Sequence, residues 1–590
     1  AGWNGGAIDW HEGADNGLVN NSIFYNNTAT SNGGGIFWEG HNGNILNSNF
    51  TFNRALGLLT IPDDEEQNYG DGGAVIWAGY NGLVDNCWFE FNDASRRGGA
   101  VYLHSCEHGN NNTTFANSHF INNTAGWNGG AIDWHDGATY GAVHNTEFIN
   151  NTAKRSGGAI FWHGQNGIIN QSTFINNRAT GEALLDPDFD FNMDTDIVVL
   201  NTPIDTSSVE GWNASKLYVV NQTLEGGIAH FESWIIKNNT WKRLDQINIT
   251  ISESIISPVD WAVDEFFGGD GGTILWMGNI GRAYNCTFID SNSARRGGGA
   301  YMTGGDYITF ELCYFENCTS GTNGGGVDWL AGANYGKIYN CVFNHTQAAR
   351  SAGAIYYDGW YGDMQNITII NTISHGGDDS FRTIKGDLIT YAGWDSSHWD
   401  TNTTGGDAGA IMFTGSNIMV YNVTFTNCVG AGRGGAVFLQ DNDNVTFELC
   451  TFENNLANGT SRNTWDDDKH PSPETLNPWL TGNGGAIAFD VGATLGIIKN
   501  SIFINNTAVR LGGAISFGSG SKFGSVENSV FENNTALRSG GAISFDGVNC
   551  TVSNSNFTNN SALGTDINRD IFDLTNQSQQ IKNATGALPC

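Results

Sequence analysis

Acidic side chains gather in short segments that could bind a metal ion. Asp186, Asp188 and Asp190 alternate along one segment, and further acids cluster at 63–66 and 466–468. Calcium takes six to eight oxygen ligands, which closely spaced carboxylates can supply, but none of these segments has the spacing of an EF-hand loop. Asp186, Asp188 and Asp190 are therefore the candidate calcium ligands, and calcium is the candidate cofactor. A solvated acidic loop is the alternative.

Histidines are concentrated in the first part of the chain, where they could bind a metal or act as acid and base. His11, His104, His135 and His163 each directly follow a short apolar strand pattern. A catalytic site would need such groups beside clustered carboxylates on one face. His11 and His135 occupy copies of one repeated segment, which favours a repeated surface. We therefore expect no enzymatic activity, with a polysaccharide lyase or hydrolase as the alternative.

Three cysteines recur at one position of a repeated pattern. Cys286, Cys313 and Cys341 each stand two residues before an aromatic residue. Cysteine is small and apolar enough for a core position, so these residues could be buried thiols. The alternative is a disulfide, which could join Cys286 to Cys313 or Cys313 to Cys341, but not both. Cys590 at the chain end could form a cross-link.

An internal repeat sets the elements that would position these groups. A tetrad of three small residues and, in most copies, an aliphatic residue recurs fifteen times, most often every 26 to 28 residues, beginning at Gly5, Gly33, Gly72, Gly98, Gly129, Gly157, Gly271, Gly298, Gly324, Ala352, Ala408, Gly434, Gly484, Gly512 and Gly540. A second motif, Phe-x-Asn-Asn, follows most tetrads. Such a period is typical of solenoids, whose turns bury a core only by stacking.

Each repeat is expected to form one turn of a coil. Ile8 and Trp10 share one face of a strand by period-two alternation, and recurrent Asn and Gly mark the corners. The prediction is an all-β, right-handed parallel β-helix with three strands per turn and about 15 or more turns. Turns stacked about 4.8 Å apart would align Trp10, Trp38 and Trp77 in one column. We expect these tryptophans to point inward, and an outward face for sugar stacking is the alternative.

A longer period groups the turns into four blocks. Their order of turn types repeats over 1–124, 125–319, 320–481 and 482–563. Insertions between turns fall mainly at one corner, which is usually the variable, interacting face of a solenoid. The expected domains are a β-helix, a projecting β-subdomain, a second β-helix and a C-terminal cap or linker, at 1–179, 180–269, 270–563 and 564–590. Shorter insertions are expected at 56–70, 372–406 and 456–482.

Charged residues precede successive tetrads in an ordered pattern. The order is arginine, aspartate, arginine within a block: Arg155, Asp270 and Arg296 in the second block and Arg350, Asp407 and Arg433 in the third, with Asp71 and Arg97 in the first. Stacked turns would set them as an Arg–Asp ladder. Exposed ion pairs contribute only about 0–1 kcal/mol each. We expect the ladder to fix the register of the turns, because a slipped turn would stack like charges.

The composition excludes several classes of protein. The 80 Gly residues occur with only 8 Pro, which excludes collagen, and 12% aromatic residues argue against disorder. The net charge of −34 argues against nucleic acid as a partner, and no apolar run is long enough to span a membrane. Glycan attachment is expected at sequons in the insertions, namely Asn213, Asn221, Asn238 and Asn402. The sequons and the acidity favour an extracellular location at the cell surface.

The alternation of GGAI with FxNN resembles the repeat of chlamydial polymorphic outer membrane proteins. The NNTA-rich corners resemble adhesin-like surface proteins of methanogenic archaea. The resemblance covers about 1–180 and 270–565, implies a β-helix that serves as a stalk or display surface, and brings no catalytic residues. We expect an adhesin that binds a cell-surface or glycan ligand through its insertion loops. The alternative is an envelope subunit that binds copies of itself end to end, because residue 1 aligns with the middle of a turn.

Overall fold

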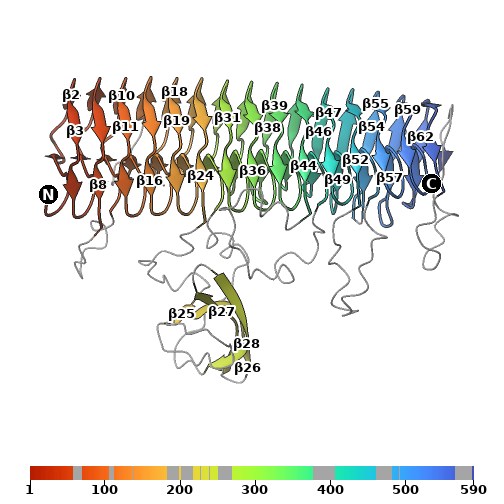
Figure 1. The fold of residues 1–590 in the computed structure, drawn as a ribbon, viewed down its shortest axis with the longest axis horizontal. Helices are drawn as coiled ribbons and strands as arrows, with labels where there is room; N and C mark the ends of the chain where they lie inside the picture. Colours follow the sequence, from red (N-terminus) through yellow and green to blue (C-terminus); the bar gives the residue numbers. More distant parts are fainter. Residues whose placement is uncertain are drawn as a thin grey trace.

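The fifteen tetrads form the turns of a rod (Figure 1). The computed structural model describes residues 1–57, 70–104, 112–135, 137–181, 269–376, 406–459, 482–490 and 492–564, and the backbone of strands 198–200, 217–225, 228–237, 240–249 and 588–589. Within the turns, each strand pairs in parallel with the equivalent strand of the next turn. The predicted parallel β-helix is therefore confirmed.

Each turn contributes one strand to each of four sheets, here called A to D. The first turn holds β1 (Ile8–Trp10), β2 (Leu18–Asn20), β3 (Ile23–Tyr25) and β4 (Thr28–Ala29). The last turn holds β61 (Ile543–Phe545), β62 (Thr551–Ser553), β63 (Asn556–Thr558) and β64 (Ser561–Ala562). Sheets A, C and D have 15 strands each, and sheet B has 16 because β65 (Leu588–Pro589) pairs antiparallel with β62.

The structure adds a fourth strand to the three predicted for each turn. The additional strands form sheet D and have two residues each, as in β4, which is too short for period-two alternation to be visible in the sequence. Four bends separate the strands, each at a residue with positive φ: Asn16, Asn21, Asn26 and Gly33 in the first turn. Asparagine and glycine tolerate this left-handed conformation best, which explains their recurrence.

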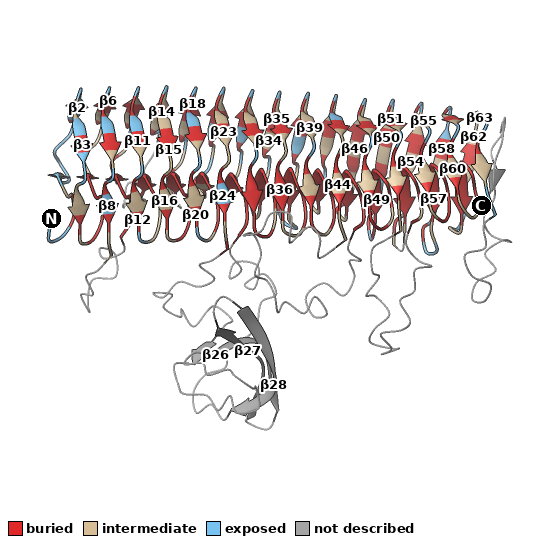
Figure 2. Ribbon diagram, in the orientation of Figure 1, coloured by how far each residue is buried: buried red, intermediate tan, exposed pale blue. Residues whose placement is uncertain are grey.

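The core lies between the sheets and is filled by columns of like residues. Trp38, Trp77, Trp134 and Trp162 are fully buried, so the inward orientation predicted for the tryptophans is confirmed. Neighbouring rings stack, with centroids 4.9 Å apart for Trp38 and Trp77. Figure 2 shows the buried residues as continuous bands along the rod. The core is therefore shared by all turns, as the repeat predicted.

Buried asparagines join the turns where sheet C meets sheet D. The second Asn of the Phe-x-Asn-Asn motif points inward. Nδ2 of Asn92, which takes the same position, donates to Oδ1 of Asn123 over 3.0 Å. Nδ2 of Asn123 donates in turn to Oδ1 of Asn151, also over 3.0 Å. The backbone amide of Asn92 donates to Oδ1 of Asn123 as well. This ladder explains the second asparagine of the motif, while the first holds the corner with positive φ.

Asn123→Leu is expected to destabilise the rod by about 3 kcal/mol or more, because buried groups of Asn92 lose their acceptor and each unsatisfied group costs about 1–3 kcal/mol. Urea unfolding would measure the loss. Asn123→Thr is the matched control, since Thr346 and Thr372 occupy this position in other turns, and it should cost less. An Asn123→Leu protein as stable as the wild type would contradict a stabilising ladder.

The insertions leave the coil between sheets D and A. The first follows β8 (Arg54–Ala55), and the largest follows β24 (Arg178–Ala179). Within the largest, β25 (Val198–Leu200), β26 (Leu217–Glu225), β27 (Ile228–Lys237) and β28 (Thr240–Ile249) form a four-stranded antiparallel sheet. The insertions predicted at 372–406 and 456–482 start too early. Their first residues include the sheet D strands β44 (Ile373–Ser374) and β52 (Leu456–Ala457), so the regular turns extend slightly further.

Candidate functional site

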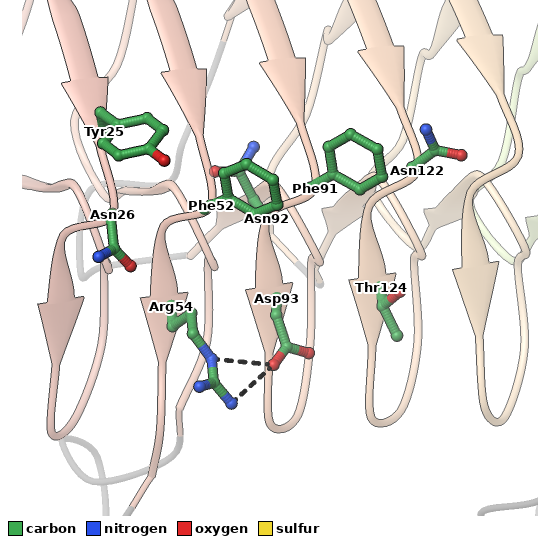
Figure 3. A pocket seen from close by; sticks show the side chains of 9 residues that line it. All are labelled: Tyr25, Asn26, Phe52, Arg54, Phe91, Asn92, Asp93, Asn122 and Thr124. Carbon is green, nitrogen blue, oxygen red and sulfur yellow. Dashed lines mark hydrogen bonds and ion pairs between the residues drawn. The ribbon is translucent and has the colours of Figure 1, made fainter.

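An open groove of about 570 Å³ runs along the corner between sheets C and D in the first four turns (Figure 3). Its sides are the sheet C strands β3, β7 (Asn49–Thr51), β11 (Trp88–Glu90) and β15 (His119–Ile121), and the sheet D strands β8, β12 (Asp93–Ala94) and β16 (Thr124–Ala125). The residues that line it are Tyr25, Asn26, Phe52, Arg54, Phe91, Asn92, Asp93, Asn122 and Thr124. We call it the aromatic groove.

Two phenylalanines in the groove hold a backbone conformation that suits asparagine. Phe52 and Phe91 have φ angles of 56° and 54°. In most other turns the same corner holds asparagine, as at Asn150 and Asn505. The left-handed conformation costs an ordinary residue roughly 1–2 kcal/mol. Such outliers in bulky residues persist where function requires them, so the two phenylalanines point to a binding surface.

The aromatic rings of the groove are open to solvent. Tyr25 is 64% exposed, Phe52 43% and Phe91 42%. The rings of Phe52 and Phe91 are stacked with centroids 5.1 Å apart, and Tyr25 meets Phe52 edge to face at 5.9 Å. Figure 3 shows the rings of Phe52 and Phe91 with their faces toward the outside of the rod. Contiguous exposed apolar surface of this kind marks interaction sites in soluble proteins.

Polar groups border the rings on the sheet D side. Arg54 Nε and Nη2 both lie 3.3 Å from Asp93 Oδ2. Both side chains are about half exposed, so the ion pair adds only about 0–1 kcal/mol to stability. Asn26 and Asn122 stand at the corner on either side of the two phenylalanines. The lining thus combines apolar faces with hydrogen-bond donors and acceptors and has no net charge, which suits a neutral, hydroxyl-rich ligand.

The aspartates of the predicted ladder form buried ion pairs beside the outer face of sheet A. Asp270 accepts hydrogen bonds from the side chain of Arg295, with Nε at 2.8 Å, and from the backbone amide of Arg296 at 3.2 Å. Asp407 pairs with Arg433, with Nη2 at 2.9 Å. Both aspartates are buried, so the energetics of exposed pairs do not apply to them.

The arginine that pairs with aspartate differs between blocks. In the first block, Arg96 Nη2 lies 2.6 Å from Asp71 Oδ2, so there, as at Asp270, the side-chain partner precedes the predicted arginine by one residue. Burial acts to raise the pKa of Asp71, but the guanidinium groups of Arg96 and Arg97 hold it below its usual value. Arg155 packs its guanidinium 5.1 Å from the ring centroid of Trp127. The amide of Arg350 donates to the carbonyl of Thr322. The register role of these residues stays a prediction.

Another buried acid, Asp133, lies near these ion pairs but accepts no hydrogen bond from the described residues. Asp133, in the middle of β17 (Ile132–Trp134), is fully buried, and neither carboxylate oxygen has a hydrogen-bond partner among the described residues. Burial raises the pKa of Asp133 to about 8, even though the Arg97 guanidinium opposes the shift. Burial, with the charge of Arg97, lowers the pKa of His135 to about 3. At neutral pH both side chains are therefore uncharged, and Asp133 is out of reach of a substrate.

The predicted calcium and glycan sites lie where the structure describes at most the backbone. Across the described ranges, no group of three His, Cys, Asp or Glu residues is arranged to hold a metal ion. The calcium candidates Asp186, Asp188 and Asp190 lie outside the described residues. So do the glycan candidates Asn213, Asn238 and Asn402, while Asn221 lies in β26, of which only the backbone is described. These sites stay predictions.

The three stacked cysteines are core residues in this structure. Cys286, Cys313 and Cys341 are buried free thiols, as are the other described cysteines. Burial raises the pKa of Cys286 and Cys313 well above the usual thiol value. Each Sγ donates to a backbone carbonyl, as from Cys313 to Glu311 over 3.4 Å. The disulfide considered from the sequence is absent between these residues, and Cys590 lies outside the described part of the chain.

The aromatic groove was not predicted, although the sequence contains a signal for it. The groove residues stand at corners, where period-two alternation gives no information about exposure. The signal is a departure from the Phe-x-Asn-Asn motif. Phe52 and Phe91 replace the first asparagine in FTFN and FEFN of two successive turns. A search for residues that break the corner rule would have identified them.

The fold and the corner motifs define a parallel β-helix repeat protein. The repeat of Chlamydia polymorphic membrane proteins matches three stretches of it, residues 21–37, 145–161 and 528–546. No curated protein matches the sequence. Within the described part of the chain, no helix is long and apolar enough to cross a membrane.

Several solved structures resemble the chain distantly. A mannuronic-acid-specific family 6 polysaccharide lyase from human gut microbiota has 8% identity and a TM-score of 0.30, over 90% of this chain and 76% of that one. The tailspike protein of E. coli bacteriophage HK620, with a bound hexasaccharide, has 10% identity and a TM-score of 0.34, over 95% and 70%. The A-module of the Azotobacter vinelandii mannuronan C-5 epimerase AlgE6 has 10% identity and a TM-score of 0.27, over 88% and 90%. At these values no activity is carried over to this chain.

Proposed function

We propose that this protein is a non-enzymatic cell-surface β-helix that binds neutral glycans through the aromatic groove and so acts as an adhesin. The observation that carries the proposal is the pair Phe52 and Phe91, two exposed aromatic residues in left-handed conformations at adjacent turns. Neither the exposure nor the conformation favours folding, and we infer that the two stacked rings are kept in adjacent turns for binding.

Three further features support this function. The match to the repeat of Chlamydia polymorphic membrane proteins supports a surface location. The net charge of −34 repels acidic polymers, so a neutral glycan or one with amino sugars is the favoured ligand. The first insertion leaves the coil directly after β8, which holds Arg54, so insertion loops could extend the same binding face.

Replacing both phenylalanines by asparagine is expected to weaken glycan binding while the fold is retained. Asparagine is the usual residue at this corner, so Phe52→Asn with Phe91→Asn should fold at least as stably as the wild type. Native gels that contain hydroxyethyl cellulose, glycol chitin, mannan or soluble starch would measure binding as retardation. The loss of two stacking rings should raise the Kd roughly tenfold.

Phe523→Asn is the matched control for that experiment. Phe523 is also exposed and has positive φ, at 56°, but it lies in a distant turn outside the groove. Its replacement should leave retardation unchanged. Retardation of the double variant equal to that of the wild type would reject the groove as the site, and a wild-type protein that none of the four polymers retards would reject the proposed ligand class.

A further inference from the structure

A second row of aromatic residues runs along the corner between sheets A and B, and all of them are exposed except the half-buried Tyr335. Tyr307, Tyr335 and Tyr361 occupy equivalent positions in three successive turns, with φ angles of 62°, 58° and 60°. The preceding turn holds Ile280 at φ 58°, and Trp360 lies beside Tyr361 with their ring centroids 6.4 Å apart. We call the three tyrosines and Trp360 the tyrosine ridge.

The ridge breaks the same corner rule as the aromatic groove. In many other turns asparagine takes this position, and those asparagines bond to one another, as from Asn81 Nδ2 to Asn42 Oδ1 over 3.0 Å. A tyrosine gives up that bond and adopts a conformation that is costly for bulky residues. Four successive turns with this departure indicate a selected surface.

The ridge residues offer unused hydrogen-bonding groups and open ring surface. The tyrosine rings stack with centroids 4.6 Å apart for Tyr307 and Tyr335 and 5.0 Å for Tyr335 and Tyr361. Tyr307, Tyr361 and Trp360 are 49%, 47% and 54% exposed. Among the described residues, the three tyrosine hydroxyls and the Trp360 indole N–H have no hydrogen-bond partner.

A polar row lies beside the rings and holds their turns in register. The amide of Asp306 donates to Asn279 Oδ1 over 2.8 Å, and the amide of Asn334 donates to Asp306 Oδ1 over 2.8 Å. Asp306 is half-buried, and its second carboxylate oxygen has no hydrogen-bond donor among the described residues. Close by, the sheet B strands of two adjacent turns begin with Lys337 and Asp363, whose opposite charges balance each other. This chemistry fits a neutral, hydroxyl-rich chain.

We infer that the tyrosine ridge is a second glycan-binding site, which makes the rod bivalent. It takes the same ligand class as the proposed groove but rests on its own residues. Phe91 and Tyr307 lie five turns apart, which is about 24 Å along the axis at 4.8 Å per turn, and the two corners lie on different edges of the coil. One rod can therefore hold two separate glycan chains and cross-link them.

The test compares a ridge variant with the groove variant on the full chain. The ridge variant carries Tyr307→Asn, Tyr335→Asn and Tyr361→Asn, which restores the usual corner residue, and Phe523→Asn serves again as control. The probes are hydroxyethyl cellulose, glycol chitin, mannan and soluble starch, in affinity gels and in turbidity assays of cross-linking. The ridge variant and the groove variant each keep one intact site, so each should show partial retardation but no turbidity. The apparent Kd of each should rise roughly tenfold, because avidity is lost.

The outcomes distinguish failure of the ridge from failure of the groove. A ridge variant that binds and cross-links like the wild type would overturn the ridge while leaving the groove intact. If the ridge variant is no longer retarded while the groove variant is retarded like the wild type, the ridge is the binding site. The groove and the bivalent rod are then both rejected. If the wild type sediments as a dimer that the ridge variant loses, the ridge binds a second copy of the chain and the glycan assignment is wrong.

Discussion

Arg295→Ala is expected to destabilise the protein by about 3–5 kcal/mol, the usual cost of leaving a buried charge without its partner. Asp270 and the Arg295 side chain are each only 4% exposed, and Arg295 binds both carboxylate oxygens of Asp270. Among the described residues, removing the guanidinium leaves the Asp270 carboxylate with the backbone amide of Arg296 as its hydrogen-bond donor. Chemical unfolding and hydrogen exchange in sheet A would measure the loss.

Two variants separate this effect from a general loss of charge. Arg54→Ala removes an arginine from the exposed pair with Asp93, and it should cost less than about 1 kcal/mol. Adding Asp270→Ser to Arg295→Ala should recover most of the stability, because Ser539 takes the aspartate position in a later turn. If Arg295→Ala costs no more than Arg54→Ala, the buried pair does not stabilise the fold.

The repeat was sufficient to predict the coil, because every turn must satisfy the same packing. Ile8 and Trp10 share a face by period two, and stacking extends that rule to all fifteen turns. The fourth strand was not predicted because Thr28 and Ala29 are too few residues to show a period. Arg295 was missed as the partner of Asp270 because it stands next to Arg296, and spacing alone cannot decide which of two adjacent arginines points toward the aspartate.

The candidate binding sites were beyond the sequence rules for a different reason. Phe52 and Tyr335 lie at corners, and corner residues are defined by backbone conformation, which a hydrophobic period does not report. The departure of Phe52 from the Phe-x-Asn-Asn motif is visible in the sequence, but its cost depends on the positive φ of the corner, which the structure supplies. The buried state of Asp133 was hidden too, because its neighbours Ile132 and Trp134 face the core and the alternation assigns Asp133 to the surface.

Asp133→Asn is expected to make the stability of the protein less dependent on pH. The pKa of Asp133 is about 8 in the folded protein, against an ordinary value of 3.8, because burial penalises the charged carboxylate. Between these two pH values the folded protein keeps a proton that the unfolded chain releases. Stability therefore falls as pH rises from about 4 to 8, by about 1.4 kcal/mol for each pH unit. The asparagine variant lacks this slope.

The prediction concerns how stability changes with pH and not its absolute value, because the buried amide of asparagine adds a fixed cost that is the same at every pH. At pH 4 the variant and the wild type differ by that fixed cost alone. At pH 7 the variant should have gained about 4 kcal/mol relative to the wild type. Asp328→Asn should behave in the same way, because Asp328 is also fully buried without hydrogen-bond partners among the described residues, and burial raises its pKa well above the usual value.

Asp9 provides the matched control for both substitutions. It occupies the same place in the first turn, but its side chain is 40% exposed, so Asp9→Asn controls for the removal of a carboxylate from this position of sheet A. Urea unfolding at half-unit steps from pH 4 to pH 9 would measure all three variants. Parallel curves for Asp133→Asn and the wild type would show that Asp133 is ionised in the folded protein. Arg97 would then have to compensate the charge, because its guanidinium opposes the burial-driven shift most strongly.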